Sequence, residues 1–84
     1  MMVLPVISLE ATGRRIETLR IEAGLSVKDL QEIFGFSTPN AIYKWQRGMC
    51  LPTIDNLIVL AMVFEVSLEE ILVIEGEGSL EKGA

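Results

Sequence analysis

The chain has 84 residues, of which 50% are hydrophobic and 23% are charged, and its net charge is −5. This length predicts one domain with a single core, and the composition excludes a disordered chain. No apolar run approaches the ~20 residues that span a bilayer, and the N-terminus lacks the basic start of a signal peptide. Because Cys50 is the only cysteine, no internal disulfide can form, and we expect a cytoplasmic protein.

The negative charge is concentrated in the C-terminal third. Residues 8–51 carry six basic and five acidic groups, whereas residues 52–84 carry Lys82 against seven acidic groups. The N-terminal part is therefore weakly positive. Such a small excess allows a nucleic-acid partner but predicts modest, salt-sensitive affinity for a single copy.

Helical periodicity predicts five helices. The first begins between Ser8 and Thr12 and runs to Ala23. The other four are expected over residues 27–34, 39–47, 54–64 and 68–72. The residues expected to face inward from the first two helices are Ile16, Leu19, Ala23, Leu30, Ile33 and Phe34. Ser67 and Glu70 have the spacing of a capping box at the start of the last helix.

Residues 26–48 are predicted to form two short helices joined by a tight turn. Ser26 and Asp29 have capping-box spacing at the start of the first helix. Gly35 ends this helix, because glycine adopts a left-handed conformation at little cost. Thr38 and Pro39 are expected to be the N-cap and the first residue of the second helix.

The second of these helices, residues 39–47, has an apolar face and a polar face. The side chains expected in the core are Ala41, Ile42 and Trp45 from this helix, together with Phe34, Phe36 and Phe64. The side chains left to point outward are Asn40, Tyr43, Lys44 and Arg47. A helix with hydrogen-bonding side chains on a free face fits the major groove of DNA. An ordinary solvated helix end, with cations near its C-terminus, is the alternative.

Helix 54–64, with Thr53 as its expected cap, is apolar almost all round. Such a helix is either wrapped by its own domain or shared with another chain. Too little sequence is present to wrap it, so we expect dimerisation. The dimer surface is either this helix with the C-terminal segment or the N-terminal arm.

The two ends of the chain frame a helix-turn-helix domain expected over residues 9–75. Residues 1–8 are apolar and contain Pro5, which fits an N-terminal arm on a partner subunit, an edge strand or a loosely ordered terminus. Residues 73–74 can extend as a strand that pairs with residues 3–7. Residues 76–84 are expected to be a flexible acidic tail.

Enzyme chemistry has little support in the sequence. The chain has no histidine and one cysteine, so it has no Ser-His or Cys-His pair and no zinc-ligand set. We therefore expect no catalytic residue, no cofactor and no metal.

Between residues 15 and 72 the sequence RIETLRIEAGLSVKDLQEIFGFS…AIYKWQRG…LPTIDNLIVLAMVFEVSLEEIL resembles the lambda-repressor-like helix-turn-helix family, which includes Cro and other regulators of the xenobiotic-response-element type. The resemblance rests on Gly24-Leu25-Ser26, Gly35, Ile42-x-Lys44-Trp45-x-Arg47-Gly48 and Leu51-Pro52, all in the family's order. It implies an all-α, five-helix fold, to which the N- and C-terminal segments described above can add short strands.

The resemblance also implies the function. Members of the family are usually transcriptional repressors that bind a palindromic operator as homodimers, which places helix 39–47 in the major groove of double-stranded DNA. By position, Asn40 and Lys44 would contact base edges, and Thr38 and Tyr43 would contact bases or backbone. Arg47 would hold a phosphate. Lys28 and Arg20 complete the expected DNA-binding residues.

Four features depart from the family pattern. Val27 replaces a glutamine that grips phosphate, and Gln31 replaces a small residue between the two helices. Gln46 replaces a glutamate that pairs with Arg20, so Arg20 either makes a charged-to-neutral hydrogen bond or is free for phosphate. The turn at residues 37–39 is one residue longer, and we hypothesise that it accommodates Gln31 and re-aims helix 39–47. These changes leave an alternative function: a protein-interaction module, like an antitoxin or antirepressor, that binds a partner through helix 54–64 and the C-terminal segment.

Overall fold

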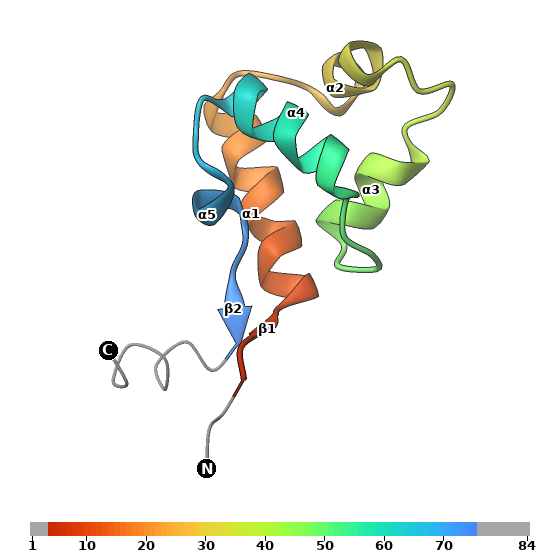
Figure 1. Ribbon diagram of the computed structural model, residues 1–84. Coiled ribbons are helices and arrows are strands. Elements are labelled where there is room, and N and C mark those ends of the chain that lie inside the picture. Colours follow the sequence, from red (N-terminus) through yellow and green to blue (C-terminus); the bar gives the residue numbers. More distant parts are fainter. Residues whose placement is uncertain (1–3, 76–84) are drawn as a thin grey trace.

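The computed structural model describes residues 4–75 and confirms the expected helical class. The elements in chain order are β1 (Val6–Ile7), α1 (Leu9–Glu22), α2 (Val27–Phe34), α3 (Asn40–Gln46), α4 (Ile54–Phe64), α5 (Leu68–Ile71) and β2 (Ile74–Glu75) (Figure 1). No helix in this part of the chain is long and apolar enough to cross a membrane. The tail expected at residues 76–84 lies outside the described residues.

Hydroxyl side chains determine where four of the helices begin. The Oγ atoms of Ser8, Ser26 and Ser67, and Oγ1 of Thr53, each accept a hydrogen bond from the backbone amide three residues later. At Ser26 the box is reciprocal, because Asp29 Oδ2 accepts from the Ser26 amide at 2.8 Å. That backbone hydrogen bond, together with the Ser26 side chain, lowers the pKa of Asp29 from its ordinary value. The carboxylate therefore stays charged at the positive end of α2 even in mild acid.

One hydrophobic core joins all five helices. Its buried members are Ile16, Leu30, Ile42, Trp45, Leu57, Leu60, Phe64 and Ile71. Two expected core positions are wrong, since Ile33 and Ala23 are exposed. Ile33 lies one residue, or about 100° of helix rotation, from Phe34, which packs against the core from α2. Ala23 is the C-cap of α1 and lies after the last regular helical residue, Glu22.

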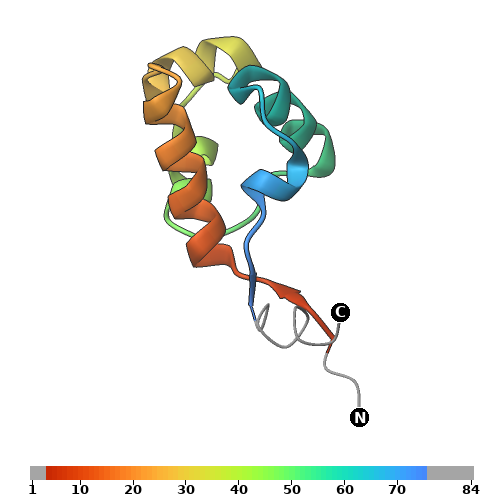
Figure 2. The same cartoon turned by 90° about the vertical axis from the view of Figure 1, so that its left-hand side faces the viewer.

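The C-terminal segment is fastened to α1 by polar contacts. The buried hydroxyl of Thr12 accepts a hydrogen bond from the Val73 amide at 2.9 Å. Arg15 Nε donates to the Glu70 carbonyl oxygen at 2.6 Å. These two bonds hold α5 and the start of β2 along α1, and β2 then pairs antiparallel with β1. The expected pairing of the two chain ends is confirmed. The two views show that this two-stranded β1–β2 ribbon extends away from the helices (Figures 1 and 2).

Candidate nucleic-acid interface

Helix α3 is held from behind by the backbone of α1. Gly13 is buried in α1, and a Cβ atom there would lie 2.6 Å from the Gln46 carbonyl oxygen and would also meet the Trp45 carbonyl oxygen. At the other side of the contact, Gly48 has φ +74°, and a Cβ there would lie 2.8 Å from Glu10 Cα. Only glycine lets the two backbones approach this closely. The C-terminal end of α3 is therefore fixed against the first turns of α1.

Three aromatic rings fill the space between α2 and α3. The rings of Phe34 and Phe36 stack with centroids 5.0 Å apart. Trp45 lies edge-on to both rings, at centroid distances of 5.5 and 6.0 Å. Offset and edge-to-face pairs of this kind stabilise a single relative orientation of the rings. Trp45 is buried in the core as expected, Phe34 and Phe36 are partly buried against it, and the cluster fixes α2 relative to α3.

The turn between α2 and α3 uses Gln31 as an internal support. Its Nε2 donates to the Phe36 carbonyl oxygen at 3.2 Å, and the side chain is half-buried, not turned to solvent. Gln31 therefore lies against the backbone of the turn. That the added turn residue makes room for Gln31 and re-aims α3 stays a hypothesis, because both partners of this hydrogen bond lie before residues 37–39.

The expected N-cap of α3 is wrong. Pro39 occupies the cap position, and α3 begins at Asn40 with no side-chain cap hydrogen bond. Thr38 lies one residue too early to be the cap. Its Oγ1 instead accepts from the Asn40 amide at 3.4 Å, a local side-chain turn that spans Pro39.

Arg20 makes the charged-to-neutral hydrogen bond that the sequence left open. Its Nε donates to Gln46 Oε1 at 2.9 Å, and its Nη1 donates to the Leu25 carbonyl oxygen at 2.8 Å. Arg20 is half-buried. The guanidinium therefore links α1, the α1–α2 connection and the end of α3 in one structural contact.

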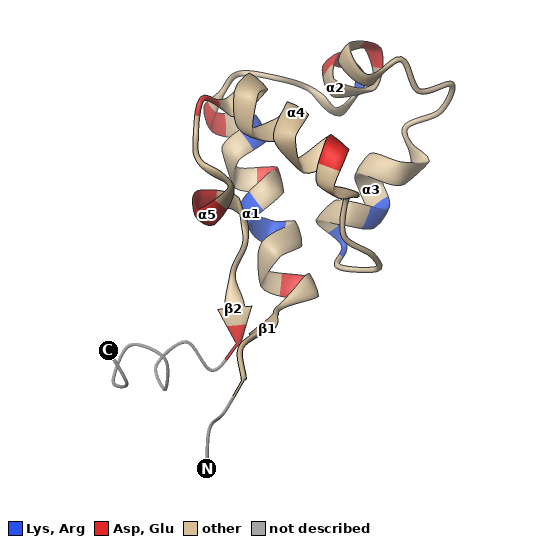
Figure 3. Ribbon diagram, viewed as in Figure 1, with Lys and Arg blue, Asp and Glu red and all other residues tan. Residues whose placement is uncertain are grey.

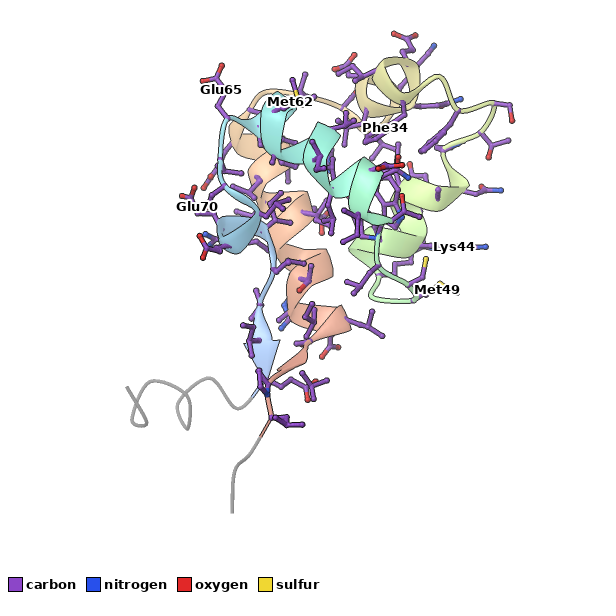
Figure 4. All side chains as sticks on the ribbon, viewed as in Figure 1. Phe34, Lys44, Met49, Met62, Glu65 and Glu70 are labelled. Carbon is purple, nitrogen blue, oxygen red and sulfur yellow. The ribbon has the colours of Figure 1, made fainter. Side chains whose placement is uncertain are left out.

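The polar face of α3 and the turn before it are free. The exposed side chains are those of Thr38, Asn40, Tyr43, Lys44 and Arg47, as expected from the sequence. The Arg47 guanidinium carbon lies 5.5 Å from the centre of the Tyr43 ring, within cation–π range. Lys44 extends away from the body of the protein (Figure 4). The arrangement offers amide, hydroxyl and cationic donors from one short, rigidly backed helix.

Charged side chains are unevenly distributed over the helices. Lys44 and Arg47 lie on α3 and Lys28 is exposed on α2, whereas α4 and α5 show only acidic groups (Figure 3). Residues 48–75 contain no lysine or arginine and five acidic residues. Asp29 and Glu32 on α2 partly offset the cations near α3. Few exposed cations therefore lie on α2 and α3, and two more exposed arginines, Arg14 and Arg15, lie on α1.

Gly13 is the site-forming residue that the sequence reading missed. The signal was present, because an isolated glycine inside a helical pattern costs about 1 kcal/mol relative to alanine and so indicates a packing reason. Gly13 is buried and does not belong to the exposed polar face of α3. It matters because it determines where α3 lies.

Two short helices joined by a glycine-containing turn, the second with an exposed polar face, define a helix-turn-helix protein. The sequence profile of the helix-turn-helix family matches residues 16–71, two thirds of the chain, and the chain belongs to this family of DNA-binding regulators. The match confirms the resemblance stated above. Among curated proteins, none matches the sequence significantly.

Solved structures show the same fold. The crystal structure of the DNA-binding domain of BldD superposes with a TM-score of 0.67 at 24% identity, covering 79% of this chain and 94% of that domain. The BldD DNA-binding domain of S. venezulae gives the same TM-score and identity, covering 79% of this chain and 97% of that domain. At this identity the likeness concerns the fold.

Proposed function

We propose that the protein is a sequence-specific transcriptional regulator that acts as a repressor, with α3 in the major groove of its operator. The observation that carries the proposal is the free polar face of α3, backed by close backbone contact with α1 at Gly13 and Gly48. A reading helix must present its donors in a fixed geometry, because base edges are distinguished by their donor and acceptor pattern.

Each exposed residue has a role that fits its chemistry. Asn40, in the first turn of α3, pairs with adenine, and Lys44, one turn later, donates to guanine N7 and O6. Thr38 and Tyr43 contact bases or backbone beside them. Arg47 and Lys28 hold phosphates on either side, and such contacts fix the register of the protein on the duplex. Arg20 acts by positioning, because its hydrogen bonds to Gln46 and Leu25 hold the end of α3.

Repression in the cytoplasm would follow from occupancy of a palindromic operator by a homodimer. The small positive surface gives one copy little phosphate attraction. Two linked copies on two half-sites gain affinity by effective concentration, without any new contact to DNA. Half-sites about one helical turn apart, ~34 Å, are expected for two α3 helices on one face of the duplex.

A protein-interaction module is the second candidate. It is favoured by the apolar side chains of Ile54, Ile58 and Met62, which are exposed at four-residue intervals along α4. An acidic residue lies at each end of this helix: Asp55 in its first turn and Glu65 at its C-cap. A partner with an apolar, basic segment would suit it.

The proposal is tested by selecting ligands from random-sequence duplexes with the purified protein at low salt. We expect enrichment of a palindrome whose half-sites lie about one helical turn apart. Recovery of unenriched sequences would reject sequence-specific binding. The stripe on α4 would then become the candidate functional surface.

A further inference from the structure

In the part of the chain that the structure describes, both edges of the β1–β2 ribbon are unpaired. The Ser8 amide donates to the Val73 carbonyl oxygen at 2.7 Å, and the register pairs Val6 with Glu75 and Ile7 with Ile74. In an antiparallel ladder, hydrogen-bonded pairs alternate with non-hydrogen-bonded ones. Ser8–Val73 and Val6–Glu75 are therefore the hydrogen-bonded pairs. The backbone N–H and C=O groups of Ile7 and Ile74 point away from the partner strand, toward the edges of the ribbon. Within residues 4–75 no third strand is present to receive them.

A ribbon of this size needs further support. Two-stranded ribbons are marginally stable in water, and an open strand edge is a template for pairing with another chain. Leu4 is 70% exposed and Val6 is 60% exposed. They lie two residues apart, the spacing that puts both on one face of an extended chain. The ribbon thus presents an apolar face as well as unpaired backbone groups.

Charge decides which edge suits a second copy of the same chain. Residues 4–9 carry no charged side chain, whereas β2 ends in Glu75. Antiparallel pairing of β1 with β1 brings no like charges together. The same comparison disfavours α4, because Asp55 in its first turn and Glu65 at its C-cap are acidic and the helix carries no cation, so self-association there would oppose acidic groups.

We propose that two copies associate by antiparallel pairing of their β1 strands, which forms a four-stranded sheet across the dimer axis. The proposal rests on the homodimer of the proposed function and names its surface. Both strands lie outside residues 16–71, the part that matches the family profile. The sheet is therefore an addition to the family's shared core.

The sheet would also set the distance between the two reading helices. β1 leads into α1 through Ser8, and Gly48 at the end of α3 packs on Glu10 in the first turn of α1. In a dimer joined at β1, a short path therefore links the dimer contact to α3 of each copy, through Ser8 and the first turn of α1. The half-site spacing of the operator follows from this connection.

Sedimentation velocity of the full chain tests the proposal with two matched variants, Val6→Lys and Ile58→Lys. Both replace an exposed apolar residue with lysine, so circular dichroism should report unchanged helix content. We expect a dimer for the unmodified protein and for Ile58→Lys, and a monomer for Val6→Lys. Dissociation by Ile58→Lys alone, or a Val6→Lys protein that stays dimeric, would overturn the proposal.

DNA binding by the same proteins separates this proposal from the proposed function. Val6→Lys should bind a single half-site as the unmodified protein does, while losing about 100-fold or more on the palindrome. A monomeric unmodified protein that still binds half-sites would overturn the β1 pairing and the homodimer, and would leave DNA reading by α3 in place. Absence of half-site binding in every protein would overturn the DNA-reading function.

A cross-linking experiment avoids the added charge. In a Cys50→Ser background, Val6→Cys should form covalent dimers with a short thiol-specific cross-linker, and Ile58→Cys should not. The reverse pattern would place the dimer contact on α4 and reject the pairing of β1.

Discussion

Replacing Gly13 with alanine is expected to lower the free energy of unfolding by about 3 kcal/mol, the upper range for overpacking. The new Cβ would lie 2.6 Å from the Gln46 carbonyl oxygen and would meet the Trp45 carbonyl oxygen. Both obstacles are backbone atoms, so no side chain can rotate out of the way. The better helix propensity of alanine, about 1 kcal/mol, offsets only part of the loss. Urea unfolding followed by circular dichroism measures the effect.

Gly24→Ala is the matched control. Gly24 has φ +76° and no atom within 4 Å of an added Cβ, so the change adds left-handed strain without a collision. Strain of that kind costs about 1–2 kcal/mol. If Gly13→Ala is no more destabilising than Gly24→Ala, then α1 and α3 do not pack as closely as described, and the account of how α3 is held is wrong.

Replacing Lys44 with alanine is expected to weaken binding to the selected operator by about 1–3 kcal/mol and to remove discrimination at one base pair. The reason is that Lys44 extends from α3 with no cap or ion-pair role in the described residues. Fluorescence anisotropy with the operator and its single-base variants measures both effects. Asn40→Ala should relax a different position in the half-site.

Arg47→Ala and Arg14→Ala provide the comparison for Lys44. Arg47→Ala should weaken binding to all sequences equally and reduce the salt slope by about 1, as loss of a phosphate contact does. Arg14 lies on α1 and pairs with Glu10 at 3.7 Å, so its removal changes net charge without touching α3. If Lys44→Ala behaves as Arg14→Ala does, Lys44 is an ordinary solvated lysine.

Most of the fold was predictable because its signals are local. The hydroxyl caps at Ser26 and Ser67, each with an acidic residue three positions on, mark helix starts that the structure places at the expected residues. The exposed residues of α3 followed from helical periodicity alone. Apolar positions at helix ends were less predictable: Ile33 and Ala23 fit the inward pattern, but no neighbouring element covers them.

The contacts that aim α3 were beyond sequence reasoning, because they depend on distances between segments far apart in the chain. Gly13 and Gly48 reveal their roles only once α1 lies against the end of α3. The link from Gln31 to the Phe36 carbonyl oxygen required the path of the long turn. The edges of the β1–β2 ribbon likewise follow from the register and not from composition.

Major-groove reading by α3 is tested most directly by placing 7-deazapurines, one at a time, at each purine of the selected half-site. This change removes N7, a major-groove acceptor, and leaves base pairing and the minor groove intact. We predict that affinity of the unmodified protein falls at one guanine and at one adenine, and that Lys44→Ala abolishes the difference at the guanine and Asn40→Ala the difference at the adenine. Unchanged affinity at every purine would contradict reading of purine N7 by Asn40 and Lys44, and with it the central claim for α3.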